Sequence, residues 1–220
     1  MPGSSPVLEV NDLYRPSCLR YSVELTVTVK ENHEYGRLLG AMKIAAARLH
    51  PWSGTIYRSA PPKWSASRAM LTGVGSMKSG ARFNAPASFS AVYGSTTPEL
   101  AMIESLAYQR RAGLPVERAL PLVFKAILIE VGRLLDLTDA AVLAELGVTN
   151  EQLRTEAWWL ARARGQESLT QAVGRAVHAC GTQALLVASA HTPAHGLNVI
   201  VLPDHIRPPS RLKVLRRPPK

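Results

Sequence analysis

The sequence predicts an α+β protein, because strand-like and helix-like segments follow one another without the regular βαβ rhythm of a doubly wound sheet. Apolar residues make up 46% of the 220 residues and charged residues only 19%. A chain of this composition can bury a sizeable core, so wholesale disorder is not expected. The length fits one domain, with room for a second only if it is small.

Six segments have the pattern of strands. Residues 22–29 are rich in β-branched side chains and alternate, which favours a strand. Residues 121–131 are nearly all apolar, as in a strand that is covered on both faces. Shorter strands are expected at 55–58, 91–95, 184–188 and 198–202.

Helical periodicity marks the remaining regular segments. Apolar residues recur at helical spacing between residues 35 and 49, which predicts a helix that Pro51 ends. Further helices are expected at about 98–111, 139–146, 150–163 and 168–179. The expected N-caps are Thr97, Asp139 or Thr138, Thr149 or Asn150, and Ser168, and the expected stops are Gly147, Gly165 and Gly181.

The stretch 61–90 is rich in Pro, Ser, Gly and Ala and is expected to be a long loop. Its glycines at positions 73, 75 and 80 permit a positive φ or a close backbone approach. Loops of this length inside a compact domain are usually functional or disordered. The residues Arg82, Phe83 and Asn84 within it favour a functional loop.

Charge and proline content divide the chain into three parts. Residues 207–220 hold six basic residues and no acidic one, so the rest of the chain keeps only +4 of the net charge of +10. This basic, proline-rich tail is expected to form no regular element. The tail could contact RNA, DNA or an acidic partner, but the rest of the chain is not expected to bind nucleic acid. The expected parts are an N-terminal extension at 1–50 (a strand plus a helix packing on the core), a main domain at 51–206 and the tail.

Neither a membrane span nor a disulfide framework is expected. No apolar run reaches about eighteen residues, and the N-terminus lacks the basic and apolar pattern of a secretory signal. The two cysteines, Cys18 and Cys180, are far apart and have no metal-ligand spacing around them. They indicate reduced thiols in a cytoplasmic protein.

Glu104 is the clearest candidate for chemistry. On a helix that begins at Pro98, its neighbours three and four positions away include Leu100, Ala101 and Ala107, which form the inward face. A carboxylate on that face must be paired or must do chemical work. A structural ion pair remains an equal alternative.

Four other polar residues stand at the ends of predicted strands or in the glycine-containing loop. Arg58 ends a strand, where it would lie at a pocket rim, and Arg82 lies in the loop; two guanidinium groups suit a phosphate-bearing substrate, although each alone could be a surface residue. Ser189 and Asn198 flank the last loop, at strand ends where side chains commonly line a site. No G-x-S-x-G elbow surrounds the serine, so a hydrolase nucleophile is not favoured.

Two further pairs favour structural roles. His191 and His195 lie in a proline-containing loop, so a zinc site is not favoured and no metal is expected. Trp158 and Trp159 are expected to be core or interface anchors, not a base-stacking platform.

The motifs, taken together and in order, resemble the RES domain. The resemblance covers about residues 52–205, and the small departures are Ala81, where a second glycine is usual, and Ala188, where proline is common. The matching segments are YRS (57–59), SGARFN (79–84), AVYGS (91–95), TPELAMIE (97–104), LLDLTD (134–139) and VASAHTPAHGLNVIVLP (187–203).

This resemblance implies an ADP-ribosyltransferase-like fold, in which a split β-sheet core surrounded by helices forms a cleft that binds NAD. It implies a toxin of a bacterial toxin–antitoxin module, whose antitoxin carries an Xre-type helix-turn-helix and a segment that blocks the cleft. Members of the family degrade NAD as a substrate, by hydrolysis or phosphorolysis, and at least one kind transfers ADP-ribose to a protein.

The resemblance also implies roles for individual residues. Glu104, Arg58 and Tyr93 would be catalytic, with Glu104 stabilising the oxocarbenium character that develops on the ribose. Tyr93 would stack on nicotinamide or ribose. The NAD-binding residues would be Arg58 and Arg82 on the pyrophosphate, with Tyr93, Ser189 and Asn198 on the nicotinamide riboside.

NAD degradation by hydrolysis or phosphorolysis is the leading prediction. Mono-ADP-ribosylation of a protein by the same residues is the first alternative, since the sequence does not reveal the acceptor. A non-enzymatic, basic nucleic-acid-binding protein is a further alternative, but only the tail offers the charge for it. A degenerate member with an interaction role is disfavoured by the retained polar residues.

Overall fold

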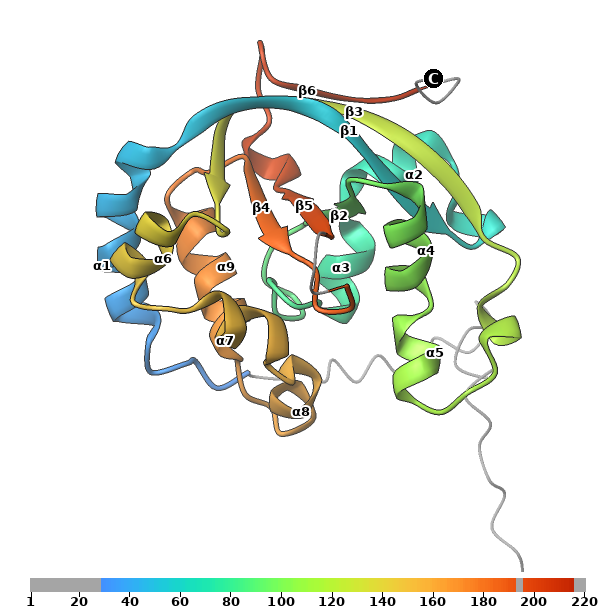
Figure 1. The fold of residues 1–220 in the computed structure, drawn as a ribbon, viewed down its shortest axis with the longest axis horizontal. Helices are drawn as coiled ribbons and strands as arrows, with labels where there is room; N and C mark the ends of the chain where they lie inside the picture. The colour runs from blue at the N-terminus through green and yellow to red at the C-terminus, as the bar shows by residue number, and fades with distance from the viewer. Residues whose placement is uncertain (1–28, 193–195, 216–220) are drawn as a thin grey trace, which may run out of the picture.

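The fold is seen in a computed structural model that describes residues 29–192 and 196–215. The strand expected at 22–29 lies outside them except for its last residue. The described strands form one sheet in the order β1-β2-β5-β4-β3-β6, and β1 also pairs with β3, so the first five strands close on themselves. The α+β prediction is confirmed, since helices surround this sheet (Figure 1).

Two long strands, β1 (His50–Ala60) and β3 (Val123–Asp136), arch over the molecule as an antiparallel pair (Figure 1). Both are longer than expected: β1 takes in Pro51 at a register shift between His50 and Trp52, and β3 continues past residue 131 to Asp136. The shorter strands agree with the sequence to within a residue: β2 (Val92–Ser95), β4 (Ala184–Ala188) and β5 (Leu197–Val201).

The expected helices form, and two of them are interrupted. Side chains of Thr97, Asp139, Thr149 and Ser168 cap helices as predicted. The helix expected at 98–111 breaks at Leu106, and the one expected at 150–163 breaks after Thr155. The bounds are α1 (Tyr35–Ala45), α4 (Pro98–Ser105), α5 (Ala107–Arg111), α6 (Ala140–Leu146), α7 (Asn150–Thr155), α8 (Trp158–Ala163) and α9 (Leu169–Ala179).

The stretch expected to be a long loop contains two short helices, α2 (Ser67–Thr72) and α3 (Val74–Ser79), so that expectation was wrong. Helices of six residues are too short to show periodicity. Gly73 separates them at φ 66°, and a Cβ there would lie 2.6 Å from the backbone nitrogen of Ala91. Gly80 also has a positive φ, of 67°, so these two glycines have the predicted role.

The basic tail contains a strand, β6 (Arg211–Val214), which contradicts the expectation of no regular element. It pairs antiparallel with residues 127–130 of β3. The prolines at 208 and 209 precede the strand, so they do not interrupt the ladder. Leu212 and Val214 pack against the core, which explains why the segment is ordered.

The helical part of the N-terminal extension packs on the core as expected. Leu38, Met42 and Ala45 of α1 are fully buried, in a cluster that includes residues of α6 and α9. A second cluster lies between strands, around Ile56 and Ile127. In the described part of the chain, no helix is long and apolar enough to cross a membrane.

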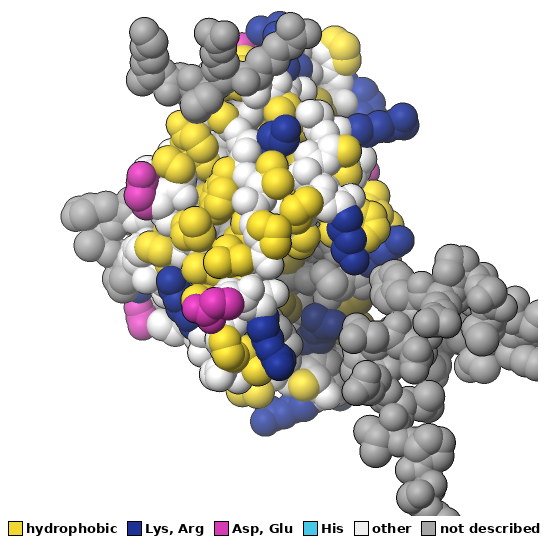
Figure 2. All heavy atoms as spheres, turned by 90° about the vertical axis from the view of Figure 1, so that its right-hand side faces the viewer, with side chains coloured by type: hydrophobic (Ala, Val, Ile, Leu, Met, Phe, Trp, Pro, Cys, Tyr) yellow, Lys and Arg dark blue, Asp and Glu magenta, His cyan; other side chains and the backbone are white. Residues whose placement is uncertain are grey.

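One face of the molecule, on the side of α4 and α5, shows many hydrophobic side chains among Lys and Arg (Figure 2). Exposed large apolar side chains in the described residues include Trp64, Met102 and Leu120. Apolar surface of this kind is available for contact with a partner.

Candidate active site

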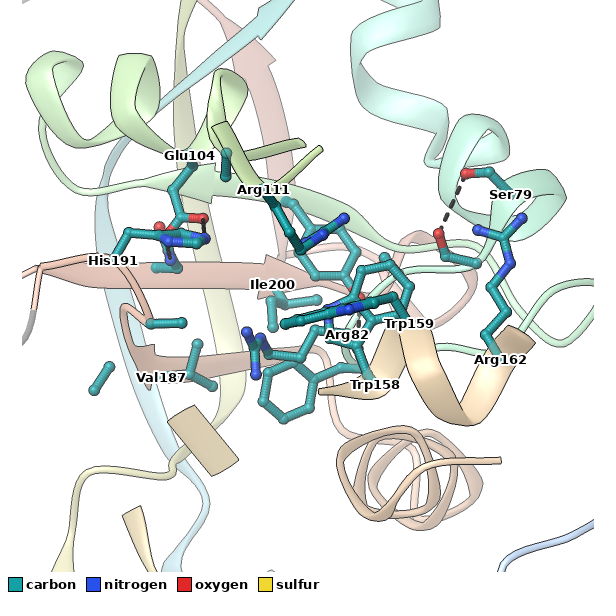
Figure 3. A pocket seen from close by; sticks show the side chains of 18 of the residues that line it. Ser79, Arg82, Glu104, Arg111, Trp158, Trp159, Arg162, Val187, His191 and Ile200 are labelled. Atoms are coloured by element: carbon teal, nitrogen blue, oxygen red, sulfur yellow. Dashed lines mark hydrogen bonds and ion pairs between the residues drawn. The ribbon is translucent and has the colours of Figure 1, made fainter. Parts of the chain in front are cut away.

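A cavity of about 720 Å³ lies between α4, α5, α8 and the strands β2, β4 and β5. Its size is within the range of small-molecule sites, roughly 300–1,000 Å³. Figure 3 shows Glu104 and His191 at one end of it and Trp158, Trp159 and Arg162 at the other. The site is built around Glu104.

Glu104 points inward from α4, as the helical periodicity predicts. The helix is fixed by its N-cap, where the Thr97 hydroxyl accepts a hydrogen bond from the backbone nitrogen of Leu100 at 3.2 Å. The Glu104 side chain is 29% exposed and lines the cavity. Its Oε1 accepts hydrogen bonds from Ser189 Oγ at 2.6 Å and Asn198 Nδ2 at 2.8 Å. These two donors to Oε1 are uncharged, and the other oxygen, Oε2, lies 3.7 Å from His191 Nε2.

Asn198 is oriented by a residue that sequence reasoning missed. Ser95 is paired with it across β2 and β5, and the Ser95 hydroxyl donates to Asn198 Oδ1 at 2.7 Å. The amide nitrogen of Asn198 is thereby directed at Glu104. The signal for Ser95 was its place at the end of the predicted strand 91–95, next to the start of the helix that bears Glu104.

Ser189 lies behind Glu104 and does not line the cavity. Its side chain is fully buried, and its hydroxyl also accepts a hydrogen bond from the backbone nitrogen of His191 at 3.0 Å. The residues on either side of it, Ala188 and Ala190, line the cavity instead. The serine is therefore placed to hold Glu104, whereas the expected contact with ribose or carboxamide is not supported by this geometry.

Arg58 was expected to lie at a pocket rim, but the structure does not place it there. Its Nη1 donates to the backbone oxygen of Tyr93 at 2.7 Å, and its Nε is buried without a hydrogen-bond partner among the described residues. Burial lowers the pKa of the guanidinium. Arg58 lines a smaller cavity of about 210 Å³, which Tyr93, Glu104 and Asn198 also line. Arg58 and Glu104 therefore share the lining of this adjoining cavity.

Arg82 lies on the wall of the large cavity and closes the end of α7. Its Nη1 donates to the backbone oxygens of Leu153, Arg154 and Glu156 at 3.0–3.3 Å, which satisfies carbonyls that a helix end leaves unpaired. Burial lowers the pKa of Arg82, and the nearby carboxylate of Glu104 opposes that shift. The guanidinium is thus fixed in place and positively charged near the carboxylate.

Tyr93 supports the turn that carries Arg82. Its hydroxyl donates to Asn84 Oδ1 at 2.8 Å and accepts from the backbone nitrogen of Phe83 at 3.0 Å. Burial raises the pKa of the phenol well above its ordinary value, so the hydroxyl stays neutral. The residue lines both cavities, which leaves the ring available for stacking.

The two tryptophans were expected to be core or interface anchors, and the structure does not place them in the core. Trp158 and Trp159 are half-buried, belong to neither core cluster and line the large cavity. Their rings form an edge-on pair with centroids 6.2 Å apart, and the Arg111 guanidinium lies 4.2 Å from the Trp159 ring centroid. No local pattern indicated this, because the short helix α8 lies at the surface over the cavity instead of within the core.

His191 is a further lining residue, with Nε2 3.7 Å from Glu104 Oε2. The second histidine of the loop, His195, lies outside the described residues. Among the residues that are described, no group of three or more His, Cys, Asp or Glu side chains could hold a metal ion.

The chain belongs to the RES domain family, whose profile matches residues 55–217. It is 30% identical over 141 residues to NAD(+) phosphorylase MbcT of Mycobacterium tuberculosis H37Rv, which covers 63% of this chain and 69% of that protein. A protein of the same name from Mycobacterium bovis matches with the same identity and the same coverage. The crystal structure of the M. tuberculosis MbcT–MbcA toxin–antitoxin complex has the same fold, with a TM-score of 0.63 and 24% identity over 81% of this chain and 89% of that chain.

Proposed function

We propose that this protein is the toxin of a bacterial toxin–antitoxin system and that it degrades NAD by cleaving the nicotinamide–ribose bond. The observation that carries the proposal is the carboxylate of Glu104, which Ser189 and Asn198 hold at one end of a cavity of about 720 Å³. Membership of the RES domain family and the similarity to an NAD(+) phosphorylase support it.

Cleavage of the bond develops positive charge on the ribose, which a fixed carboxylate stabilises. The two hydrogen bonds to Oε1 keep Glu104 in one orientation, so little reorganisation is needed in the transition state. In this mechanism Ser189 and Asn198 are positioning residues, and Glu104 is the catalytic residue.

The residues that line the cavity can be matched to the successive parts of a dinucleotide. With the nicotinamide ribose at Glu104, the pyrophosphate would lie at Arg82, whose guanidinium offers charged donors. The adenine would stack on Trp158 and Trp159 at the far end. Arg58, which holds Tyr93, would contact the nicotinamide riboside from the adjoining cavity.

The partner would be an antitoxin, as in the structurally similar complex. We expect it to carry an Xre-type helix-turn-helix and a segment that enters the cavity and blocks it. The positive charges of Arg82 and Arg111 in the cavity wall favour an acidic segment. We also place the protein in the cytoplasm, where NAD and such a partner would be present.

Expression of the chain without a partner tests this function. Growth should stop and cellular NAD should fall, while the matched Glu104→Gln variant at equal soluble expression should do neither. Normal growth of cells that contain the soluble wild-type chain, with unchanged NAD, would contradict the proposal.

A further inference from the structure

The end of the large cavity that lies away from Glu104 carries a positive charge. Arg162 lines the cavity there, together with Trp158 and Trp159 (Figure 3). All three residues belong to α8, where Arg162 follows the tryptophans by four and three positions, so the side chains lie on neighbouring parts of one helix face. A ring that stacks on the tryptophans would therefore lie close to this guanidinium.

The guanidinium of Arg162 is not engaged by other residues in the part of the chain that the structure describes. It forms no ion pair and no side-chain hydrogen bond with them. The other two arginines of the large cavity do make contacts. Arg82 donates to three backbone oxygens, and the Arg111 guanidinium lies 4.2 Å from the Trp159 ring centroid. Arg162 can therefore turn its donors to a ligand without breaking a contact within the described protein.

No carboxylate accompanies Arg162 at this end of the cavity. Glu104 is the only acidic residue among the described residues that line the large cavity, and it stands at the opposite end (Figure 3). In dinucleotide sites that select NAD, an Asp or Glu commonly accepts from the 2′-hydroxyl of the adenosine ribose, whereas an arginine accommodates the 2′-phosphate of NADP. The physical reason is general, because a carboxylate repels a phosphate and a guanidinium binds its oxygens.

We propose that the large cavity accepts NADP as well as NAD, with Arg162 binding the 2′-phosphate, an inference that rests on the proposed function and extends its substrate. With adenine on the tryptophans, the 2′-phosphate is attached to the ribose next to that base, on the side of the molecule that α8 covers. The nicotinamide end of NADP is the same as that of NAD. The contact with Arg162 therefore leaves the chemistry at Glu104 unchanged.

The reaction on NADP breaks the bond from C1 of the ribose to the nicotinamide nitrogen. The electron pair of that bond goes to the pyridinium ring, which leaves as neutral nicotinamide. An oxygen of water or of phosphate forms the new bond to C1, and an attacking water gives up one proton to the solvent. The other product keeps the 2′-phosphate in either case.

The contact with Arg162 should affect binding more than chemistry. Arg162 is exposed, so water and salt screen its attraction for a phosphate. A hydrogen bond to a charged group still contributes about tenfold in affinity. Because the 2′-phosphate is remote from the reacting atoms, it is held equally in the ground state and in the transition state. The effect should therefore fall on the KM for NADP and not on kcat.

The test measures nicotinamide release by the purified full chain with NAD and with NADP as separate substrates, and mass spectrometry checks that the product from NADP retains its 2′-phosphate. We expect the wild type to cleave both. Arg162→Gln should raise the KM for NADP by about tenfold and leave the KM for NAD within about twofold. The matched control is Arg164→Gln, which removes an exposed arginine at the end of the same helix that does not line the large cavity.

The dependence on salt gives a second measurement, which needs no variant. Added salt should raise the KM of the wild type for NADP more than that for NAD, because NADP brings one more exposed charge contact. In Arg162→Gln the two KM values should rise in parallel. If Arg162→Gln does not fold, a parallel rise in the wild type contradicts the inference.

The other contrary outcomes differ in what they leave standing. Cleavage of NAD but not of NADP by the wild type removes the second substrate and leaves NAD degradation intact. An equal change in both KM values in Arg162→Gln, or no change in either, removes Arg162 as the phosphate contact. The absence of nicotinamide release from either substrate removes the proposed function as well.

Discussion

At the scale of single residues, the carboxylate of Glu104 is held by neutral donors from two distant parts of the chain. Ser189 is 85 positions away and Asn198 is 94 positions away. Neither donor brings a positive charge to Oε1, so the carboxylate stays available to stabilise a cationic transition state. The chain thus separates orientation, which serine and asparagine provide, from electrostatic stabilisation, which the glutamate provides.

The substitution Ser189→Ala tests this separation. Loss of a hydrogen bond of 2.6 Å to a charged group should let the carboxylate move, so kcat should fall by about tenfold or more while the KM for NAD changes little. Steady-state kinetics measure both constants, and Ser65→Ala, at a partly exposed serine that lines neither the large cavity nor the smaller one beside Arg58, is the control. A higher KM with an unchanged kcat would show that Ser189 binds the substrate directly.

Part of this site could be predicted from the sequence. The inward position of Glu104 follows from helical periodicity alone, and the resemblance to the RES domain supplied Arg82, Tyr93 and Asn198. Local patterns could not reveal that Arg58 lies inside an adjoining cavity or that Ser95 orients Asn198, because both facts depend on strand pairing. Register between distant strands is set by the whole sheet.

At the scale of elements, the capping residues of the helices and the short strands β2, β4 and β5 were predictable, whereas α2, α3 and β6 were not. A side chain such as Thr149 or Ser168 fixes a helix start through contacts within four residues. By contrast, α2, α3 and β6 have four to six residues each and owe their conformation to tertiary packing.

The strand β6 should contribute to stability and not to catalysis. Leu212 packs against the core and Lys213 is exposed, so Leu212→Ser should lower the free energy of unfolding by about 1–2 kcal/mol and Lys213→Ser should not. At about 2–4 °C per kcal/mol, calorimetry resolves the difference in Tm. Neither residue lines the large cavity, so NAD turnover at low temperature should persist in both. Loss of turnover in a stable Leu212→Ser variant would place part of the site in the tail.

The packing of α9 should make stability depend on pH. His178 of that helix stacks on Phe89, with ring centroids 4.3 Å apart, and burial together with His205 lowers its pKa below the ordinary value of 6.5. Because the pKa is lower in the folded state, the unfolded chain binds a proton at a higher pH than the folded chain does. The contribution of His178 to the free energy of unfolding is therefore present above pH 6.5 and is lost as the pH falls below that value.

Chemical denaturation of the wild type and of His178→Gln across this pH range is the measurement. The free energy of unfolding of the wild type should fall more steeply on acidification than that of the variant. Equal slopes for the two proteins would show that His178 does not titrate in the way its burial implies.

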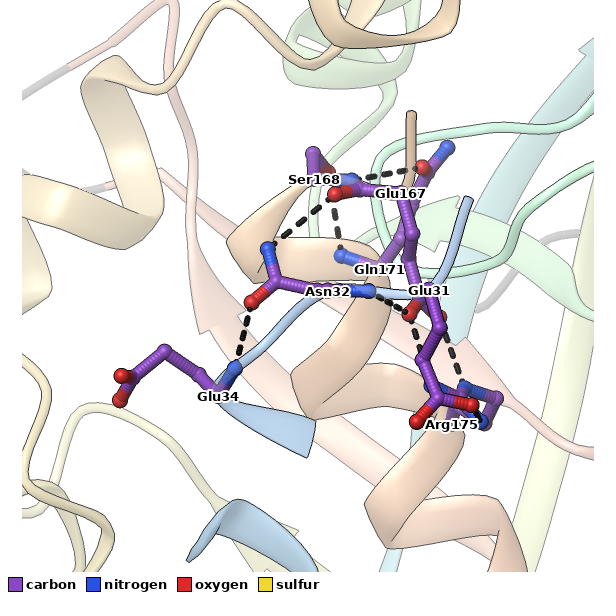
Figure 4. Close-up of polar contacts among 7 residues, drawn as sticks. All are labelled: Glu31, Asn32, Glu34, Glu167, Ser168, Gln171 and Arg175. Atoms are coloured by element: carbon purple, nitrogen blue, oxygen red, sulfur yellow. Dashed lines mark hydrogen bonds and ion pairs between the residues drawn. The ribbon is translucent and has the colours of Figure 1, made fainter. Parts of the chain in front are cut away.

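At the scale of the whole molecule, the N-terminal extension and the main domain meet at α9. Figure 4 shows Glu31 and Asn32 beside Glu167 and Arg175. The buried carboxylate of Glu167 accepts from the backbone nitrogen of Asn32 at 3.0 Å and from Arg175 Nε at 2.8 Å. We propose on this basis that the extension, residues 1–50, stabilises the fold through its contacts with α9 and the residue that precedes its cap, with 51–206 as the catalytic domain.

The central claim is that this fold cleaves NAD with Glu104, and one measurement tests it most directly. The purified full chain is incubated with NAD in the presence of phosphate, and nicotinamide release is followed over time for the wild type and for Glu104→Gln. The substitution preserves size and removes the charge, so the rate should fall on the order of a hundredfold to a thousandfold while the Tm stays close to that of the wild type. Wild-type turnover in a folded Glu104→Gln variant, or no nicotinamide release by the wild-type chain, would contradict the account.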